Sequence, residues 1–236
     1  MSRSVSIPQL SGAGSFDAYI ARPDGEPKAA IIVIQEIFGV NAGIRRKCDK
    51  LAQAGYLAAA PDLFWRLERN LQLDPDVEAE FQRALELMAR FDQDEGIRDI
   101  EATIRYLRAE EGAEKVGAVG YCLGGRLAFM TAARTDCDAS VGYYAVGVDG
   151  LLREKHAIAN PLMLHIAGDD GFVDKATQAA MHEGLDDHPK VTLYDYPGVD
   201  HGFATEMGKR RIDEAAELAD RRTMEFFARH LTDSSS

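Results

Sequence analysis

The chain has 236 residues, a formal net charge of −12 and 46% hydrophobic residues, and its sequence pI is near 5.0. These values fit a soluble α/β domain and exclude the strongly basic surface that binds nucleic acid. The three cysteines are widely spaced and odd in number, so they indicate neither a disulfide framework nor a zinc site, and we expect no metal and no cofactor. Neither a signal-peptide core nor an apolar stretch of ~20 residues is evident, so we expect a cytoplasmic protein without membrane contact.

The first predicted elements are a hairpin and a buried strand. Residues 3–8 and 14–21 alternate loosely between polar and apolar side chains and flank a Ser-Gly-Ala-Gly turn, which indicates two antiparallel strands. The apolar run at 29–34 is rich in β-branched residues and is typical of a strand buried on both faces. A helix at 43–54 and a short buried strand at 56–60 are predicted next.

The rest of the chain continues to alternate between helix and strand. An irregular stretch at 61–76 comes first, and such segments often form part of a binding rim. The predicted helices after it lie at 76–90, 94–109, 124–134, 174–184 and 209–230, and the strands between them at 116–119, 139–144, 161–167 and 190–196. This order predicts a mainly parallel sheet with helices on both faces, in one domain over residues 1–236 whose serine-rich end at 233–236 is frayed.

The segment Val119-Gly-Tyr-Cys-Leu-Gly-Gly125 has the pattern Gly-x-Cys-x-Gly between a predicted strand and a predicted helix. This is the context of a nucleophile elbow, a sharp turn in which side chains two residues before and after the nucleophile would collide. The turn places the sulfur above a helix N-terminus, where the dipole and free amides favour an anion. We therefore interpret Cys122 as a nucleophile, and Cys48 and Cys137 as buried small hydrophobic residues.

An acid and a histidine follow the cysteine in the order that such a triad requires. Asp169, Asp170 and Asp174 lie at the carboxyl end of the predicted strand 161–167, where sites collect in open α/β sheets. Asp174 fits a helix N-cap, and Asp170 is preferred as the acid because it starts the turn before an apolar pair; a contribution from Asp169 stays open. His201 lies between the last strand and the last helix, whereas the other histidines fit core or surface positions.

The segment Gln35-Glu36-Ile37-Phe38-Gly39-Val40-Asn41 directly follows the buried strand 29–34. A carboxylate is expensive to bury, so Glu36 is interpreted as a partly buried acid at the mouth of the site with a raised pKa. The alternative is an acid at a strand end that faces solvent. The amides of Ile37 and Leu123 are the candidates for the oxyanion hole.

Together these motifs resemble the dienelactone hydrolases, a cysteine-nucleophile branch of the α/β-hydrolase superfamily. The segments that carry the resemblance are 35–41, 61–63, 104–106, 119–125, 141–144, Asp170 with 172–173, and 201–204. The resemblance implies an α/β-hydrolase fold and a triad of Cys122, Asp170 and His201. It also implies that Glu36 takes the thiol proton when substrate arrives, and that the thiolate then opens an enol lactone through a thioester, a reaction of aromatic degradation.

The sequence departs from that family where the substrate carboxylate is held. The family has one arginine in the helix before the elbow and another directly after the His-x-Phe-Ala segment, and here these places hold Phe81 and Thr205. Arg83 could substitute, although two residues along a helix change its face by about 200°. The expected substrate-binding residues are Tyr144, Phe38, Phe81, Arg83, Phe172, Phe203 and Thr205.

Three functions stay open at this point. The first is hydrolysis of an enol lactone or a small ester, and the second is a general carboxylesterase or thioesterase with a more apolar substrate. The third is a non-catalytic ligand-binding protein with the same fold. In each case the expected partner is a small molecule, and the expected state is a monomer or a weak homo-oligomer.

Overall fold

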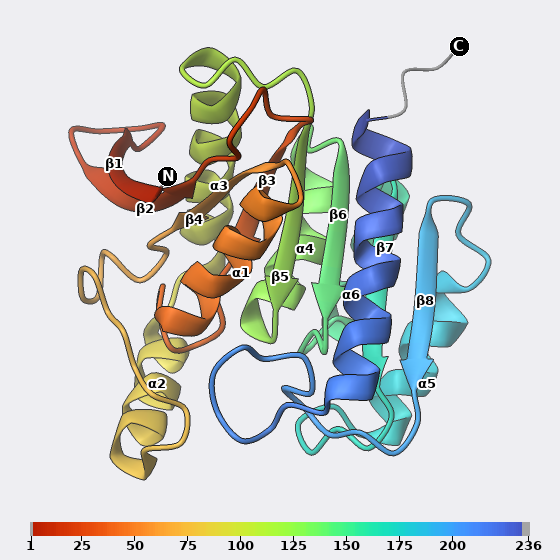
Figure 1. The fold of residues 1–236 in the computed structure, drawn as a ribbon. Coiled ribbons are helices and arrows are strands. Elements are labelled where there is room, and N and C mark those ends of the chain that lie inside the picture. The colour runs from red at the N-terminus through yellow and green to blue at the C-terminus, as the bar shows by residue number, and fades with distance from the viewer. Residues whose placement is uncertain (1, 233–236) are drawn as a thin grey trace.

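Residues 2–232 of the computed structural model are described here, and they contain one eight-stranded sheet with helices on both faces (Figure 1). The order of strands across the sheet is β1-β2-β4-β3-β5-β6-β7-β8. The β1–β2 and β2–β4 pairs are antiparallel, and the pairs from β4 to β8 are parallel. The strands are β1 Ser2–Pro8, β2 Ser15–Ala21, β3 Ala30–Ile34, β4 Leu57–Pro61, β5 Val116–Tyr121, β6 Ala139–Tyr143, β7 Leu162–Ala167 and β8 Val191–Tyr196.

Helices cover the two faces of this sheet, α1 and α6 on one face and α3, α4 and α5 on the other (Figure 1). The helices are α1 Ala42–Gln53, α2 Glu78–Arg90, α3 Gln93–Ala109, α4 Leu123–Arg134, α5 Lys175–Leu185 and α6 Asp213–Phe227, with a 3₁₀ helix at Asp149–Ala157 and a π turn at Ala228–Thr232. Among the described residues, no helix is both long and apolar enough to span a membrane.

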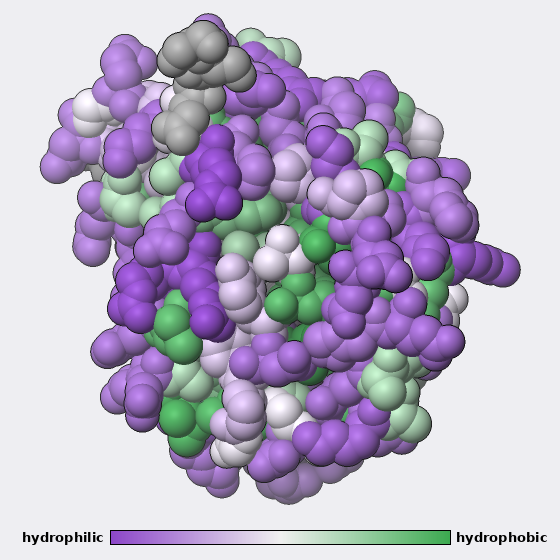
Figure 2. All heavy atoms as spheres, turned by 90° about the vertical axis from the view of Figure 1, so that its right-hand side faces the viewer, coloured by the Kyte–Doolittle hydropathy of each residue, from purple (hydrophilic) through white to green (hydrophobic). Residues whose placement is uncertain are grey.

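The core has two halves because the inner strands are buried on both faces. In β3, Ile32 and Ile34 pack with α3 and α4, whereas Ile31 and Val33 pack with α1 and α6. This explains why β3 appears in the sequence as a continuous apolar run rather than an alternating one. The edge strands of the sheet are β1 and β8. Figure 2 shows the side of the molecule that carries β8, where hydrophilic residues surround a smaller apolar area.

The predicted α/β-hydrolase fold is confirmed, and the predicted strands and helices are present with ends that differ by a few residues. The last helix is the largest difference: it begins at Asp213, because Gly208 has a positive φ of 99° and Ile212 is extended. The strand predicted at 139–144 ends at Tyr143, since Tyr144 has a φ of 36°. The 3₁₀ helix was not predicted, and the tail predicted to fray at 233–236 lies outside the described residues.

Candidate active site

Cys122 lies in the turn between β5 and α4, with a φ of 59° and a ψ of −115°. Positive φ is strained for a residue with a side chain, so the surrounding structure must hold it. The glycines allow this turn: a Cβ at Gly120 would overlap the carbonyl oxygen of Gly124, and one at Gly124 would overlap the carbonyl oxygens of Ile34 and Gln35. The start of α4 is therefore pressed against the end of β3, and the sulfur stands at the carboxyl edge of the sheet.

Asp170 and His201 meet at the same edge. Asp170 follows β7, and its Oδ1 accepts hydrogen bonds from the backbone N–H groups of Phe172 at 2.8 Å and Val173 at 3.2 Å. His201 follows β8, and its Nδ1 lies 2.9 Å from Oδ2 and 3.1 Å from Oδ1 of Asp170. Both side chains are buried. The carboxylate thus fixes the ring of His201 with Nδ1–H toward Asp170 and leaves Nε2 for another partner.

The sulfur of Cys122 lines the same cavity as the ring of His201, close enough for the two groups to influence each other's charge. Burial disfavours the charged imidazolium, but the negative charges of Cys122 and Asp170 and the hydrogen bonds to them outweigh burial and raise the pKa of His201 to about 10. The arrangement therefore favours a protonated ring beside the Asp170 carboxylate, and a cation next to a cysteine is one of the features that activate it as a nucleophile.

The other candidates for the acid and the nucleophile lie away from His201. The exposed side chain of Asp169 is 3.5 Å from Lys175 Nζ, and Asp174 caps α5 by accepting a hydrogen bond from the Thr177 N–H at 2.8 Å. Cys48 and Cys137 are buried, and burial raises the pKa of both thiols. Neither thiol therefore reaches solvent or readily ionises.

Glu36 lines the same cavity as Cys122 and His201 and is 8% exposed. The hydroxyl of Tyr144 donates a hydrogen bond to Glu36 Oε1 at 3.4 Å. Burial raises the pKa of Glu36, although the positive charges of His201, Lys47 and Arg210 oppose this. Glu36 is thus a buried acid that lines the same cavity as Cys122, and not an acid that faces solvent.

The two candidate oxyanion donors lie on adjoining segments. Leu123 is the first residue of α4, and an N–H in the first turn of a helix has no acceptor within the helix. Ile37 lies in the β3–α1 loop and lines the cavity. Because Gly124 packs directly on the carbonyls of Ile34 and Gln35, the two segments are in contact beside the sulfur.

Comparisons with known proteins show to which family the chain belongs. The family model for the dienelactone hydrolase family matches residues 16–231. The chain is 45% identical over 231 residues to a protein of Azospirillum brasilense named "Putative carboxymethylenebutenolidase", covering 96% of this chain and 98% of that protein. It is 37% identical over 229 residues to a carboxymethylenebutenolidase of Pseudomonas putida, covering 97% of both chains. The chain belongs to the dienelactone hydrolase family. It is therefore a carboxylic ester hydrolase.

The solved structures show the same fold. The structure titled "Putative Dienelactone Hydrolase" from Klebsiella pneumoniae superposes with a TM-score of 0.81 at 27% identity, covering 97% of this chain and 99% of that one. The mainly parallel sheet described above is thus the fold of this hydrolase family.

The substrate cavity of this hydrolase is largely apolar. One wall is formed by a face of α2, which contributes Phe81, Leu85 and Met88. Phe38 lies 5.9 Å from Phe81, ring centre to ring centre. Among the described residues that line the cavity, Arg210 is the one with a permanent positive charge.

The predicted substrate-binding residues divide into two groups. Phe38, Phe81, Phe172 and Thr205 line the cavity. The remaining three do not line it: Tyr144 lies behind Glu36, Phe203 is fully buried against Tyr144, and Arg83 is exposed and pairs with Glu68. Arg83 points away because two positions along a helix carry a side chain to another face.

Sequence reasoning missed Leu85, Met88, Met207 and Arg210, all of which line the cavity. The helical spacing of Leu85 and Met88 from Phe81, four and seven residues, was a usable signal, since such residues share one face. No comparable signal existed for Met207 and Arg210, because they lie in the irregular loop before α6.

Proposed function

We propose that this protein hydrolyses enol lactones or small carboxylic esters through a triad of Cys122, His201 and Asp170, with a thioester intermediate. The observation that carries the proposal is the ring of His201, whose Nδ1 lies 2.9 Å from Asp170 Oδ2 and which lines one cavity together with Cys122. The sulfur and the ring both open onto one cavity.

In the first half of the reaction, the Cys122 thiolate attacks the carbonyl carbon and forms a C–S bond. The carbonyl electron pair moves to oxygen, where the amides of Leu123 and Ile37 stabilise the charge, a contribution of about 3–4 kcal/mol per donor in other enzymes. Collapse of this intermediate breaks the C–O bond, and the protonated ring of His201 gives its proton to the departing enolate or alkoxide oxygen. A lactone substrate thereby opens and stays attached as a thioester.

In the second half, His201 takes a proton from water as the water attacks the thioester carbonyl. The C–S bond breaks, the acid product leaves and the sulfur is restored. Asp170 keeps the ring oriented and stabilises its protonated form. In this scheme Glu36 accepts the thiol proton when substrate enters, and burial beside Cys122 with a raised pKa supports such a proton exchange.

The apolar cavity favours a second substrate class, neutral esters with an apolar substituent. The α2 wall presents Phe81, Leu85 and Met88, and Thr205 stands where the resemblance implied an arginine. A small charged lactone would find one exposed guanidinium, that of Arg210, among the described lining residues. We therefore place small enol lactones and neutral esters within the same proposal.

The test is the Cys122→Ser variant, assayed with a dienelactone, a neutral enol lactone and p-nitrophenyl acetate. We expect kcat to fall roughly a thousandfold or more, because serine lacks the acidity of a thiol and catalytic groups act as a unit. Cys48→Ala is the matched control, since it removes a thiol that is buried in α1, and it retains activity. Wild-type rates in Cys122→Ser, or no turnover of any of these substrates by the native protein, would contradict the proposal.

A further inference from the structure

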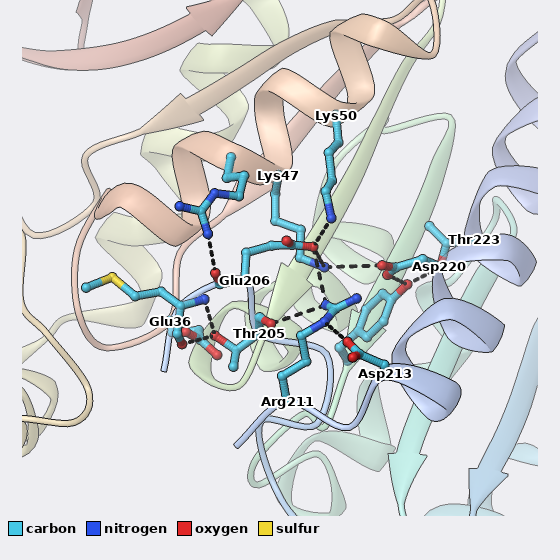
Figure 3. A network of polar contacts seen from close by, with 12 residues as sticks. Glu36, Lys47, Lys50, Thr205, Glu206, Arg211, Asp213, Asp220 and Thr223 are labelled. Carbon is cyan, nitrogen blue, oxygen red and sulfur yellow. Dashed lines mark hydrogen bonds and ion pairs between the residues drawn. The ribbon is translucent and has the colours of Figure 1, made fainter. Parts of the chain in front are cut away.

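Lys47 of α1 is buried directly behind the active site. It is 6% exposed, whereas lysine is almost never buried unless it is paired. Its ammonium lies 3.3 Å from Glu206 Oε1 and 3.5 Å from Asp220 Oδ2 (Figure 3). It also lies 4.9 Å from the centre of the Tyr121 ring. None of the triad chemistry uses this residue.

Glu206 is the centre of the network that holds Lys47. Its Oε1 also accepts from Lys50 at 2.7 Å and pairs with Arg211 at 3.4 Å, and its carboxylate is 6% exposed (Figure 3). Glu206 lies between Thr205 and Met207, which both line the substrate cavity. The network therefore fastens one wall of the substrate cavity to α1.

A second, small cavity separates Glu36 from Lys47. It is lined by Glu36, Lys47, Tyr121, Tyr144, Thr205 and Glu206. Glu36 thus faces Cys122 and the substrate cavity on one side and Lys47 on the other. Figure 3 shows the same arrangement, with Glu36 and Thr205 on one side of the network and Lys47 reaching toward Glu206.

The charges around Glu36 make Lys47 important for its ionisation. The positive neighbours are Lys47, His201 and Arg210, and the other titratable neighbours are Cys122, Tyr121, Tyr144, Glu206 and, on the substrate cavity, Asp76. Removing the charge of Lys47 deletes a cation and also leaves Glu206 and Asp220 less compensated. Both changes disfavour a negative charge on Glu36.

We propose that Lys47 is a positioning residue of the active site, which keeps the Glu36 carboxyl able to ionise beside Cys122 and is held in place by Glu206 and Asp220. The inference rests on the proposed function, in which the Glu36 carboxylate takes the proton of the Cys122 thiol as substrate enters. Lys47 touches neither the substrate cavity nor the sulfur, and it acts through Glu36.

The first test is the pH profile of kcat/KM for p-nitrophenyl acetate in Lys47→Met. We expect the acidic limb of the profile to move to higher pH by about one unit, because Glu36 then loses its proton only at higher pH. In Lys47→Arg, which keeps the positive charge, the limb returns to its wild-type pH. Lys50→Met is the matched control: Lys50 pairs with the same Glu206 but is half exposed and does not line the small cavity, so the limb moves much less than in Lys47→Met.

The second test uses the opposite charge change. Glu206→Gln removes an anion from the small cavity, so the acidic limb moves to lower pH. This variant supplies the test if Lys47→Met does not fold. In a Glu36→Gln background neither substitution moves the limb. An unchanged limb in the folded single variants, or a shift that persists without the Glu36 carboxyl, overturns the inference.

A third measurement separates this inference from the proposed function. The rate at which iodoacetamide alkylates Cys122 depends on thiolate formation and needs no turnover. Its pH profile shifts upward in Lys47→Met if Lys47 acts through Glu36, and it stays fixed if Lys47 is merely structural. Absence of turnover with every ester and lactone contradicts the proposed function alone.

Discussion

At the scale of single residues, the site depends on backbone geometry as much as on side chains. Cys122 has a φ of 59°, a conformation that costs a residue with a side chain of order 1–3 kcal/mol. The strain is held because Gly120 and Gly124 allow strand, turn and helix to approach within contact distance of one another. The sulfur is therefore placed by two residues that have no chemistry of their own.

This geometry predicts the effect of Gly120→Ala. The new Cβ would overlap the carbonyl oxygen of Gly124, so the turn must shift and the protein loses about 1–3 kcal/mol of stability. We also expect kcat for p-nitrophenyl acetate to fall at least about tenfold, because small displacements of a catalytic group are costly. Urea unfolding and steady-state kinetics measure the two effects. Gly150→Ala, where a Cβ meets nothing within 4 Å, is the control, and equal behaviour of the two variants would refute the argument.

At the scale of elements, α2 is the wall that shapes the substrate cavity. Phe81, Leu85 and Met88 lie on one face toward the cavity, and Gln82 and Glu86 lie exposed on the other. The helix has few charged groups at the cavity, so its contribution to binding is apolar contact. Its inner face therefore sets which acyl or alcohol groups fit.

Phe81→Ala tests this role of α2. Removing the ring deletes apolar area worth roughly 1–2 kcal/mol of binding. We expect kcat/KM for p-nitrophenyl butyrate to fall about tenfold, and kcat/KM for the acetate, which reaches less of the wall, to fall less. Glu86→Ala on the outer face is the control and leaves both values unchanged. An equal loss for the two esters would show that Phe81 supports the fold rather than the substrate.

Much of this architecture was predictable from local pattern. The apolar run of β3, the glycines around Cys122 and the order of Cys122, Asp170 and His201 led to the fold and to the residues that meet at the sheet edge. The loop from 208 to 212 was not predictable, because its basic residues fit a helix by composition. In the structure, Arg210 and Arg211 donate hydrogen bonds to the backbone carbonyls of His201 and Thr205, and these contacts hold the segment as a loop. The prediction that Phe203 binds substrate was wrong, because its position in the motif does not reveal which way its side chain points.

At the scale of the whole molecule, His165 joins β7 to β8 and α6. Its Nδ1 lies 2.8 Å from the Tyr196 hydroxyl, and its Nε2 lies 2.9 Å from Thr223 Oγ1. Burial, together with the positive charges of Arg222 and Lys47, lowers the pKa of His165 to about 3. The folded protein therefore keeps this ring neutral at pH values where an unfolded chain protonates it.

The consequence is a defined loss of stability in acid. Between about pH 6.5 and 3 the unfolded state binds one proton more than the folded state at this site, so the free energy of unfolding falls with decreasing pH by up to ~1.4 kcal/mol per unit. His165→Gln removes this dependence, and urea unfolding at several values between pH 6 and 4.5 shows a shallower slope than the wild type. His156→Gln, at an exposed position, retains the full slope. Parallel slopes in all three proteins would rule out His165 as the cause.

The proposed catalytic groups follow four different strands, β3, β5, β7 and β8, and this spacing has a consequence for the protein as it is made. A ribosome releases the Cys122 thiol well before His201, and no fragment that stops short of β8 contains the base that activates it. An interrupted chain is therefore catalytically silent, however much of the sheet it has formed. In the proposed mechanism, turnover therefore reports that the chain has been made at least as far as His201 and that its strand ends have come together.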